Sequence, residues 1–196
     1  MAAELTNVVM PAAEMQRAAL VSHPDTPGEA VWRIAVEANL VAGMTLGCNY
    51  SLHGDLERVR VPGARTGRRA DGLWQHTCFE VFVAAAGDPG YLEFNFSPGL
   101  DWAAYRFAAY RKEMSPANLA QAPGLNVRRM ADRLDLSATV HLAGLGTAFT
   151  APRLRVALAA VVEEEDGRLS YWALQHPPGN PDFHHADGFA LELGVL

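Results

Sequence analysis

Acidic, amide and aromatic side chains alternate along two neighbouring segments in the middle of the chain. Glu80 lies in segment 75–84, and Glu93 and Asn95 lie in segment 91–97. Carboxylate and amide oxygens are fixed hydrogen-bond acceptors, and aromatic rings offer flat apolar faces. A surface that combines them suits a polyhydroxylated small molecule such as a sugar. The same residues are equally compatible with an ordinary hydrated sheet face.

A second concentration of polar groups is the proline-rich segment 176–185, which holds three histidines and Asp182. Imidazole and carboxylate can bind zinc or iron, but the spacing matches neither C-x-x-C nor H-E-x-x-H. We therefore favour, over a metal site, the interpretation that these polar side chains cap turns within the segment. An intermediate interpretation is that this segment overhangs the polar sheet face and supplies His176 or His184 as ligand contacts.

The elements that position these residues are predicted to be strands. Short apolar or alternating runs recur, each closed by Gly, Pro, Asn or Asp, which is typical of an all-β protein. The predicted strands are 17–23, 31–38, 44–52, 75–84, 91–97, 102–110, 126–130, 133–142, 154–163, 168–175 and 189–193. Segment 102–114 would also suit a helix, although a strand is favoured. Hairpin turns between the runs predict an antiparallel β-sandwich.

Strand alternation assigns the side chains to faces. The six residues expected in the core are Phe79, Val81, Val83, Leu92, Phe94 and Phe96. Pairing Ala84 with Tyr91 places Glu80 opposite Asn95. In the next hairpin, pairing Phe96 with Ala103 places Glu93 beside Arg106, with Trp102 on the same face. This register is inferred from the pattern, and a shift of one residue would reverse the assignment of faces.

Composition limits the classes of function. The chain has 196 residues, of which 49% are apolar, and we expect a single domain over 1–196. The net charge of −6 gives no electrostatic reason to bind nucleic acid. No apolar segment is long enough to predict a membrane span. The beginning of the chain does not resemble a secretory signal, so a cytoplasmic location is expected.

Motifs for catalysis are scarce. The sequence contains no G-x-S-x-G turn, P-loop or dinucleotide-binding fingerprint. Glu80 and Glu93 could act as the acid and base of a glycosidase, and Cys78 with His76 could form a thiol nucleophile. A lone carboxylate pair is weak evidence, and Arg106 would hold one of the two ionised. The Cys78–His76 pair has no visible orienting partner. We therefore favour a binding protein and keep an enzyme acting on a sugar or cell-wall intermediate as the less favoured alternative.

Four stretches of the chain together resemble a known family. They are 69–82, 93–98, 101–105 and the closing HPPGNPDFH at 176–184. They resemble the DOMON-like family, which is similar to the type 9 carbohydrate-binding modules. The resemblance implies a β-sandwich of the jelly-roll or immunoglobulin-like kind that binds a ligand. Type 9 modules hold sugar ends between tryptophans, and this analogy implies contacts from Trp74, Glu80, Asn95, Trp102 and Arg106.

Haem-binding DOMON domains provide an alternative to sugar binding. They ligate iron with Met and His or Lys, and Met44 and His141 lie on predicted strands here, although they match no motif. The main hypothesis is a carbohydrate-like small-molecule binding domain without a cofactor or metal. Its predicted ligand contacts are Trp74, His76, Glu80, Glu93, Asn95, Trp102, Arg106, His176, Asp182 and His184.

Overall fold

The chain folds almost entirely into antiparallel strands. The computed structural model describes residues 15–63 and 67–194. The strands are β1 (Gln16–Ser22), β2 (Val31–Val41), β3 (Thr45–Gly54), β4 (Cys78–Ala85), β5 (Tyr91–Phe96), β6 (Trp102–Phe107), β7 (Ser115–Pro116), β8 (Gly124–Arg129), β9 (Arg133–His141), β10 (Arg153–Glu163), β11 (Leu169–Ala173) and β12 (Leu191–Gly194). Three short 3-10 helices complete it: η1 (Leu73–Gln75), η2 (Thr147–Thr150) and η3 (Ala186–Gly188). Within the described ranges, no helix has the length and apolarity to cross a membrane.

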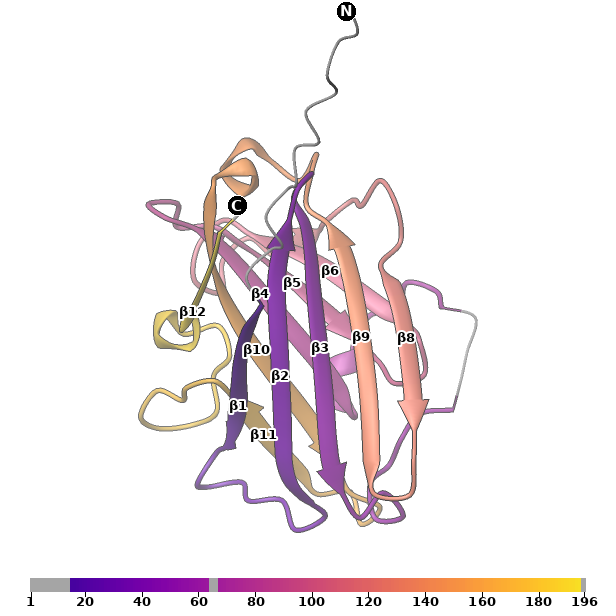
Figure 1. Cartoon of the computed structure of the whole chain (residues 1–196). Helices are drawn as coiled ribbons and strands as arrows, with labels where there is room; N and C mark the ends of the chain where they lie inside the picture. The colour runs from indigo at the N-terminus through magenta and orange to yellow at the C-terminus, as the bar shows by residue number, and fades with distance from the viewer. Residues whose placement is uncertain (1–14, 64–66, 195–196) are drawn as a thin grey trace, which may run out of the picture.

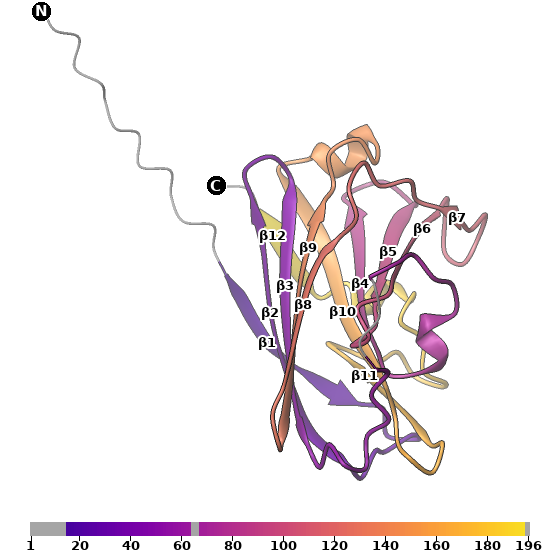
Figure 2. The same cartoon turned by 90° about the vertical axis from the view of Figure 1, so that its right-hand side faces the viewer.

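The strands form one sheet that curls into two layers (Figures 1 and 2). The first layer has the order β1-β2-β3-β9-β8, and the second has the order β7-β6-β5-β4-β10-β11, with β12 beside β10. Strand β1 joins the layers, because its first residues pair with β2 while Val21 and Ser22 pair with β11. This arrangement confirms the predicted antiparallel β-sandwich.

The main core lies between the two layers. All six residues predicted for it are fully buried, and they belong to one apolar cluster to which both layers contribute. Tyr50 on β3 extends across the core and donates a hydrogen bond of 2.7 Å to the Glu80 carbonyl on β4. The tyrosine hydroxyl is therefore satisfied in the interior, as a buried polar group must be.

The predicted strands are all present, and their ends differ by a few residues. The helical alternative for 102–114 is wrong, because β6 occupies 102–107. The short strand β7, which pairs with β6, was not predicted. The pairing of β4 with β5 is confirmed, since Glu80 lies opposite Asn95 and Ala84 lies opposite Tyr91.

The predicted register of β5 with β6 is wrong by one residue. Phe96 pairs with Trp102 instead of Ala103. The cause is the connecting loop: the Ser97 N–H donates to the Asp101 carbonyl at 2.9 Å, which leaves a three-residue loop where four residues were expected. Such loops close with a left-handed residue, which is Leu100 here, with φ of 75°. Glycine is the usual residue at this position, so a leucine there gives no sign of the turn in the sequence.

The shifted register moves two predicted site residues to the opposite face. Arg106 pairs with Leu92, and its guanidinium donates to the Leu145 carbonyl and lies 5.6 Å from the centre of the Phe149 ring. Trp102 packs against the main core. The predicted Glu93–Arg106 ion pair is therefore wrong. Tyr105 occupies the position opposite Glu93 instead.

Candidate functional site

Three polar side chains are buried together on the outer face of the second layer. Glu80 on β4 is 3% exposed, while Glu93 and Asn95 on β5 are 5% and 0% exposed. The Asn95 amide donates a hydrogen bond of 2.8 Å to Glu93 Oε1. The sequence predicted this shared face but did not predict its burial. We call these three residues the acid–amide cluster.

A second apolar cluster surrounds the acid–amide cluster. Its buried members are Phe82, Tyr91, Ala103, Tyr105, Phe107, Ala157, Ala159, Ala173 and Phe189. Two alanines lie directly beside the polar groups, since Ala159 pairs with Glu80 and Ala103 pairs with Asn95. These short side chains take up little space beside the carboxylate and the amide. The polar groups therefore lie in apolar, low-dielectric surroundings.

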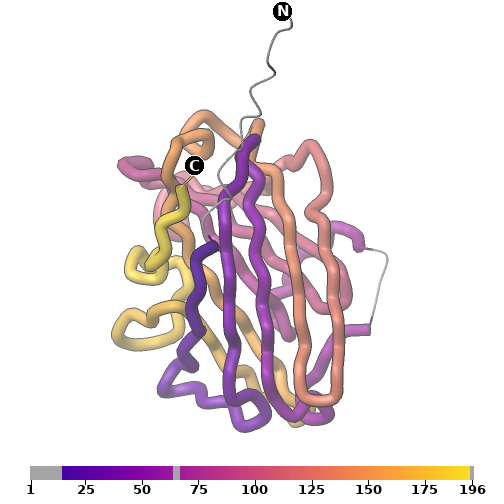
Figure 3. Tube along the Cα trace, viewed as in Figure 1, coloured from indigo at the N-terminus to yellow at the C-terminus, as the bar shows by residue number. Residues whose placement is uncertain are grey.

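The segment that buries this face is the strap, residues 174–190, which connects β11 to β12. Figure 3 shows it as the yellow loops beside the second layer. The His184 ring lies 5.1 Å from the rings of both Phe82 on β4 and Phe107 on β6. Phe183 lies 5.9 Å from the Tyr171 ring on β11. The strap thus extends across the outer face from β11 to β6, as the intermediate interpretation of this segment expected. The favoured interpretation also holds at Asp182, whose Oδ1 accepts from the His184 backbone N–H at 3.1 Å. A ligand contact by His184 stays a prediction.

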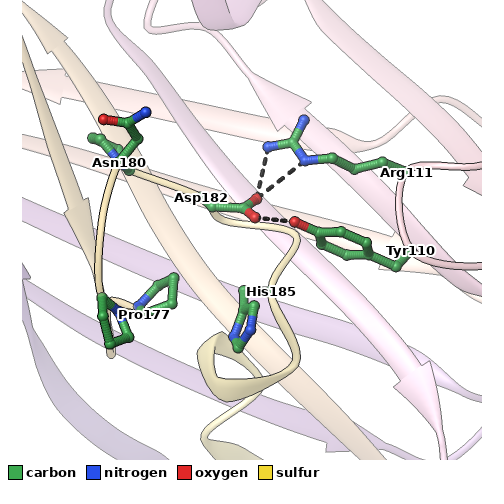
Figure 4. Close-up of a pocket in the computed structure, with 8 residues that line it drawn as sticks. Tyr110, Arg111, Pro177, Asn180, Asp182 and His185 are labelled. Carbon is green, nitrogen blue, oxygen red and sulfur yellow. Dashed lines mark hydrogen bonds and ion pairs between the residues drawn. The ribbon is translucent and has the colours of Figure 1, made fainter.

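The middle of the strap is tied to the loop after β6 by a cluster that we call the latch: Tyr110, Arg111 and Asp182. The Asp182 carboxylate accepts hydrogen bonds from the Tyr110 hydroxyl and from Arg111 Nε and Nη2, the latter two at 3.2 and 2.6 Å (Figure 4). The latch lines a hollow of about 440 Å³, together with strap residues that include Asn180 and His185. Arg111 is left-handed, with φ of 53°, which a non-glycine residue adopts only at a cost.

A chain of contacts links the latch to the acid–amide cluster. The Arg111 backbone N–H donates to the Tyr91 hydroxyl at 3.1 Å, and this hydroxyl lies 2.8 Å from His184 Nδ1. Because Tyr91 already accepts from Arg111, its own proton can be donated to Nδ1. That leaves the hydrogen of neutral His184 on Nε2, which lies 3.9 Å from Glu93 Oε2. This separation is too long for a hydrogen bond.

The first part of the strap is held by a pair of histidines. His176 Nε2 lies 2.8 Å from the Val21 carbonyl, and His23 Nε2 lies 2.9 Å from the Gly179 carbonyl. The two imidazole rings meet edge to face at 4.8 Å. His176 therefore fixes the strap to β1 and is not part of the acid–amide cluster.

The acid–amide cluster retains unused hydrogen-bond acceptors. Glu80 Oε1 and Asn95 Oδ1 are buried, and neither has a hydrogen-bond partner among the described residues. Leaving a buried polar atom unpaired costs about 1–3 kcal/mol. Burial, and then the nearby charge of Glu93, raise the pKa of Glu80 well above its usual value. Burial also raises the pKa of Glu93 to about 7.

His184 is neutral at physiological pH. Burial first, and then the positive charge of Arg111, lower its pKa to about 4. It can therefore donate through one ring nitrogen and accept through the other, without adding a positive charge beside the carboxyl groups.

Trp74 and His76 lie at the edge of this region. Trp74 belongs to η1, which packs against β4 and β5, and its side chain is half-exposed. Its neighbour Leu73 contacts the second apolar cluster. His76 Nδ1 lies 2.7 Å from Glu163 Oε2, so His76 is engaged away from the acid–amide cluster.

Two further contributors to the site were missed by sequence reasoning. Tyr105 donates to Asp71 at 2.7 Å, and Arg111 forms the latch. The correct β5–β6 register would have revealed Tyr105. No local pattern marks Arg111, because its partner Asp182 is distant in the sequence.

The haem, metal and thiol alternatives gain no support from the geometry. Among residues 15–63 and 67–194, no group of three or more His, Cys, Asp or Glu side chains could hold a metal ion. His141 is exposed and hydrogen-bonded to Thr45 at 2.9 Å, at the strand end beside Met44, which does not fit an enclosed haem pocket. The Cys78 thiol is buried, and burial raises its pKa well above the usual value, so the reactive thiolate is disfavoured.

Comparison with known proteins places the fold among β-sandwich carbohydrate-binding modules. Among these modules, those of family 9 have the same fold as this chain. A "putative carbohydrate-binding protein" from Bacteroides uniformis is similar, with a TM-score of 0.69 and 14% identity over 94% of this chain and 87% of that protein. A family 9 module from Caldicellulosiruptor kristjanssonii, solved with glucose, has a TM-score of 0.51 and 10% identity over 87% of this chain and 80% of that module. No family model and no curated protein matches the sequence.

Proposed function

We propose that this protein binds a small carbohydrate at the acid–amide cluster, beneath the strap. The observation that carries the proposal is the pair of buried acceptors, Glu80 Oε1 and Asn95 Oδ1, that have no partner among the described residues. Sugar hydroxyls would donate to these oxygens. The surrounding aromatic rings would contact the C–H faces of the sugar. The sugar-bound module with a similar fold supports this choice of ligand class.

Access to the site requires the strap to move, because the three polar residues of the acid–amide cluster are almost completely buried. The latch is a solvent-exposed contact of the strap, since the Arg111 side chain is 51% exposed. We therefore propose that a sugar first contacts the hollow beside the latch and reaches the cluster when Asp182 separates from Arg111. His184, which lies between the latch and Glu93, would then contact the bound ligand.

The direct test is isothermal titration of the protein with a panel of mono- and disaccharides. We expect saturable binding of at least one sugar, and a loss of affinity of about tenfold or more in Asn95→Ala, because a buried ligand hydrogen bond disappears. Glu57→Gln, which removes an exposed carboxylate elsewhere, should bind like the wild type. A broad panel without any saturable binding would contradict the proposal.

A substitution of Trp74 tests whether the edge of the site contributes to binding. If its half-exposed indole stacks on the sugar, Trp74→Ala should weaken binding about tenfold, which is about 1.4 kcal/mol. Thermal unfolding should change little, because half of the side chain is already in water. Trp32→Ala is the matched control, since Trp32 is 64% exposed on β2 in the other layer. Equal weakening in both variants would exclude a specific role for Trp74.

A further inference from the structure

The hydrogen-bonding groups of the acid–amide cluster are unequally distributed between donors and acceptors. The Asn95 amide nitrogen already donates to Glu93, and the Tyr105 hydroxyl already donates to Asp71. Among the described residues, the buried atoms of this cluster that lack a partner are Glu80 Oε1 and Asn95 Oδ1. The amide oxygen is an acceptor, and so is the carboxyl oxygen in its ionised form. The site is therefore complementary to a ligand group that is rich in donors.

The site also contains two buried carboxyl groups but no positively charged side chain that is free to pair with them among the described residues. Glu80 and Glu93 are buried at diagonal positions on the same face of β4 and β5, and the charge of Glu93 raises the pKa of Glu80. The Arg111 guanidinium near them is held by the Asp182 carboxylate, and His184 is neutral. Buried carboxylates without a paired cation are costly, so a cation delivered by the ligand would stabilise their ionised forms.

The side chains around the two carboxyl groups suit a cation as well. Phe82 follows Glu80 on the same face of β4, and Tyr105 lies opposite Glu93 on β6. Aromatic rings attract cations through their negative faces, most strongly where water is excluded. Ala103 and Ala159 beside the polar groups add little bulk there.

From these observations we infer that the ligand carries a protonated amine, as an amino sugar does. The ammonium group would lie against Glu80 Oε1 and Asn95 Oδ1, and a ligand hydroxyl would bridge the 3.9 Å separation between His184 Nε2 and Glu93 Oε2. This inference rests on the proposed function, because it specifies the chemistry of the same site.

The experiment compares D-glucosamine with D-glucose and N-acetyl-D-glucosamine by isothermal titration at pH 7. The three sugars share a ring, but only the first carries a cationic amine. We expect glucosamine to bind about tenfold or more tightly than either neutral sugar. The preference should persist in about 0.5 M NaCl, because a buried ion pair is screened much less than a surface one.

Substitutions of the two glutamates test whether the amine of the ligand binds at the acid–amide cluster. Glu80→Gln should weaken glucosamine more than glucose, so that the ratio of their affinities falls to about one. Glu57→Gln should keep the full ratio, since its carboxylate is exposed and is not part of the acid–amide cluster. Thermal unfolding confirms that each variant is folded. If Glu80→Gln does not fold, Glu93→Gln serves as the second variant with the same expected fall in the ratio.

The outcomes separate the inference from the proposed function. Binding of glucose or N-acetylglucosamine as tightly as glucosamine would overturn the amine while supporting a sugar site. A preference that disappears in salt, or that survives in both Glu80→Gln and Glu93→Gln, would assign the amine to surface attraction and also overturn the inference. Absence of binding by all three sugars and by the wider panel would overturn both.

Discussion

Glu93→Gln is expected to stabilise the folded protein at pH 8 by on the order of 2 kcal/mol or more, and at pH 5 by only about 1 kcal/mol. The reason is that burial raises the pKa of the Glu93 carboxyl to about 7. At pH 8 the folded protein must hold a buried carboxylate, whereas glutamine has the same shape without the charge. At pH 5 the carboxyl is protonated in the folded state and already mostly ionised in the unfolded chain, so the stabilising effect of the substitution is smaller there.

The direction follows from the proton balance. A carboxyl whose pKa is higher in the folded than in the unfolded chain contributes stability below the unfolded value of about 4.3, and this contribution is lost as the pH rises through about 7. Glu80 acts in the same direction, because burial raises its pKa too. His184 acts oppositely: its pKa is lowered to about 4, so its contribution is present above about 6.5 and is lost on acidification.

The measurement is the difference in free energy of unfolding between Glu93→Gln and the wild type from pH 5 to pH 8, which cancels the contribution of His184. It should rise with pH, and the melting temperature of the variant should exceed that of the wild type by roughly 4–8 °C at pH 8. Glu57→Gln should show no such rise, because its carboxylate is exposed. A difference that is constant over this range would show that Glu93 is solvated in the folded protein.

Strand positions could be predicted from the sequence because they depend on local patterns. Alternating apolar residues closed by turn residues identified every strand longer than two residues. The β4–β5 register also followed, because placing Phe79 and Phe94 in the core leaves few alternatives. The prediction of the β5–β6 register was wrong because Leu100 adopts a left-handed backbone conformation that leucine rarely adopts. The resulting shift by one residue places Tyr105 instead of Arg106 on the face of the site.

The polar centre of the site could be predicted, but its enclosure could not. Glu80 and Asn95 share a face because of strand parity, which depends only on position in the chain. The burial of that face depends on where residues 174–190 pack, and the contact between Arg111 and Asp182 joins positions 71 residues apart. The proline-rich composition indicated a rigid overhanging segment, yet it could not show that His184 contacts the sheet while His176 binds β1.

Asp182→Ala is expected to open the strap about 30-fold more often, which corresponds to about 2 kcal/mol. The substitution removes hydrogen bonds from Tyr110 and Arg111, and bonds to a charged acceptor contribute about 1.5–3 kcal/mol each before solvent exposure reduces them. It also leaves Arg111 in a left-handed conformation without its partner carboxylate. Native-state hydrogen exchange measures the effect at the Gly188 amide, which is bonded to the His185 carbonyl at 3.0 Å.

The control for the latch is Asp187→Ala. It removes another carboxylate of the strap, which lies outside the latch and whose Oδ2 is 3.5 Å from His185 Nδ1. It should leave exchange at Gly188 within a few-fold of the wild type, and exchange in β4 and β5 should stay slow in both variants. If the strap controls access, Asp182→Ala should also increase the association rate of any sugar that binds by a similar factor, because the closed state that excludes ligand becomes less populated. Faster exchange without faster association would mean that ligand reaches Glu80 and Asn95 by another route.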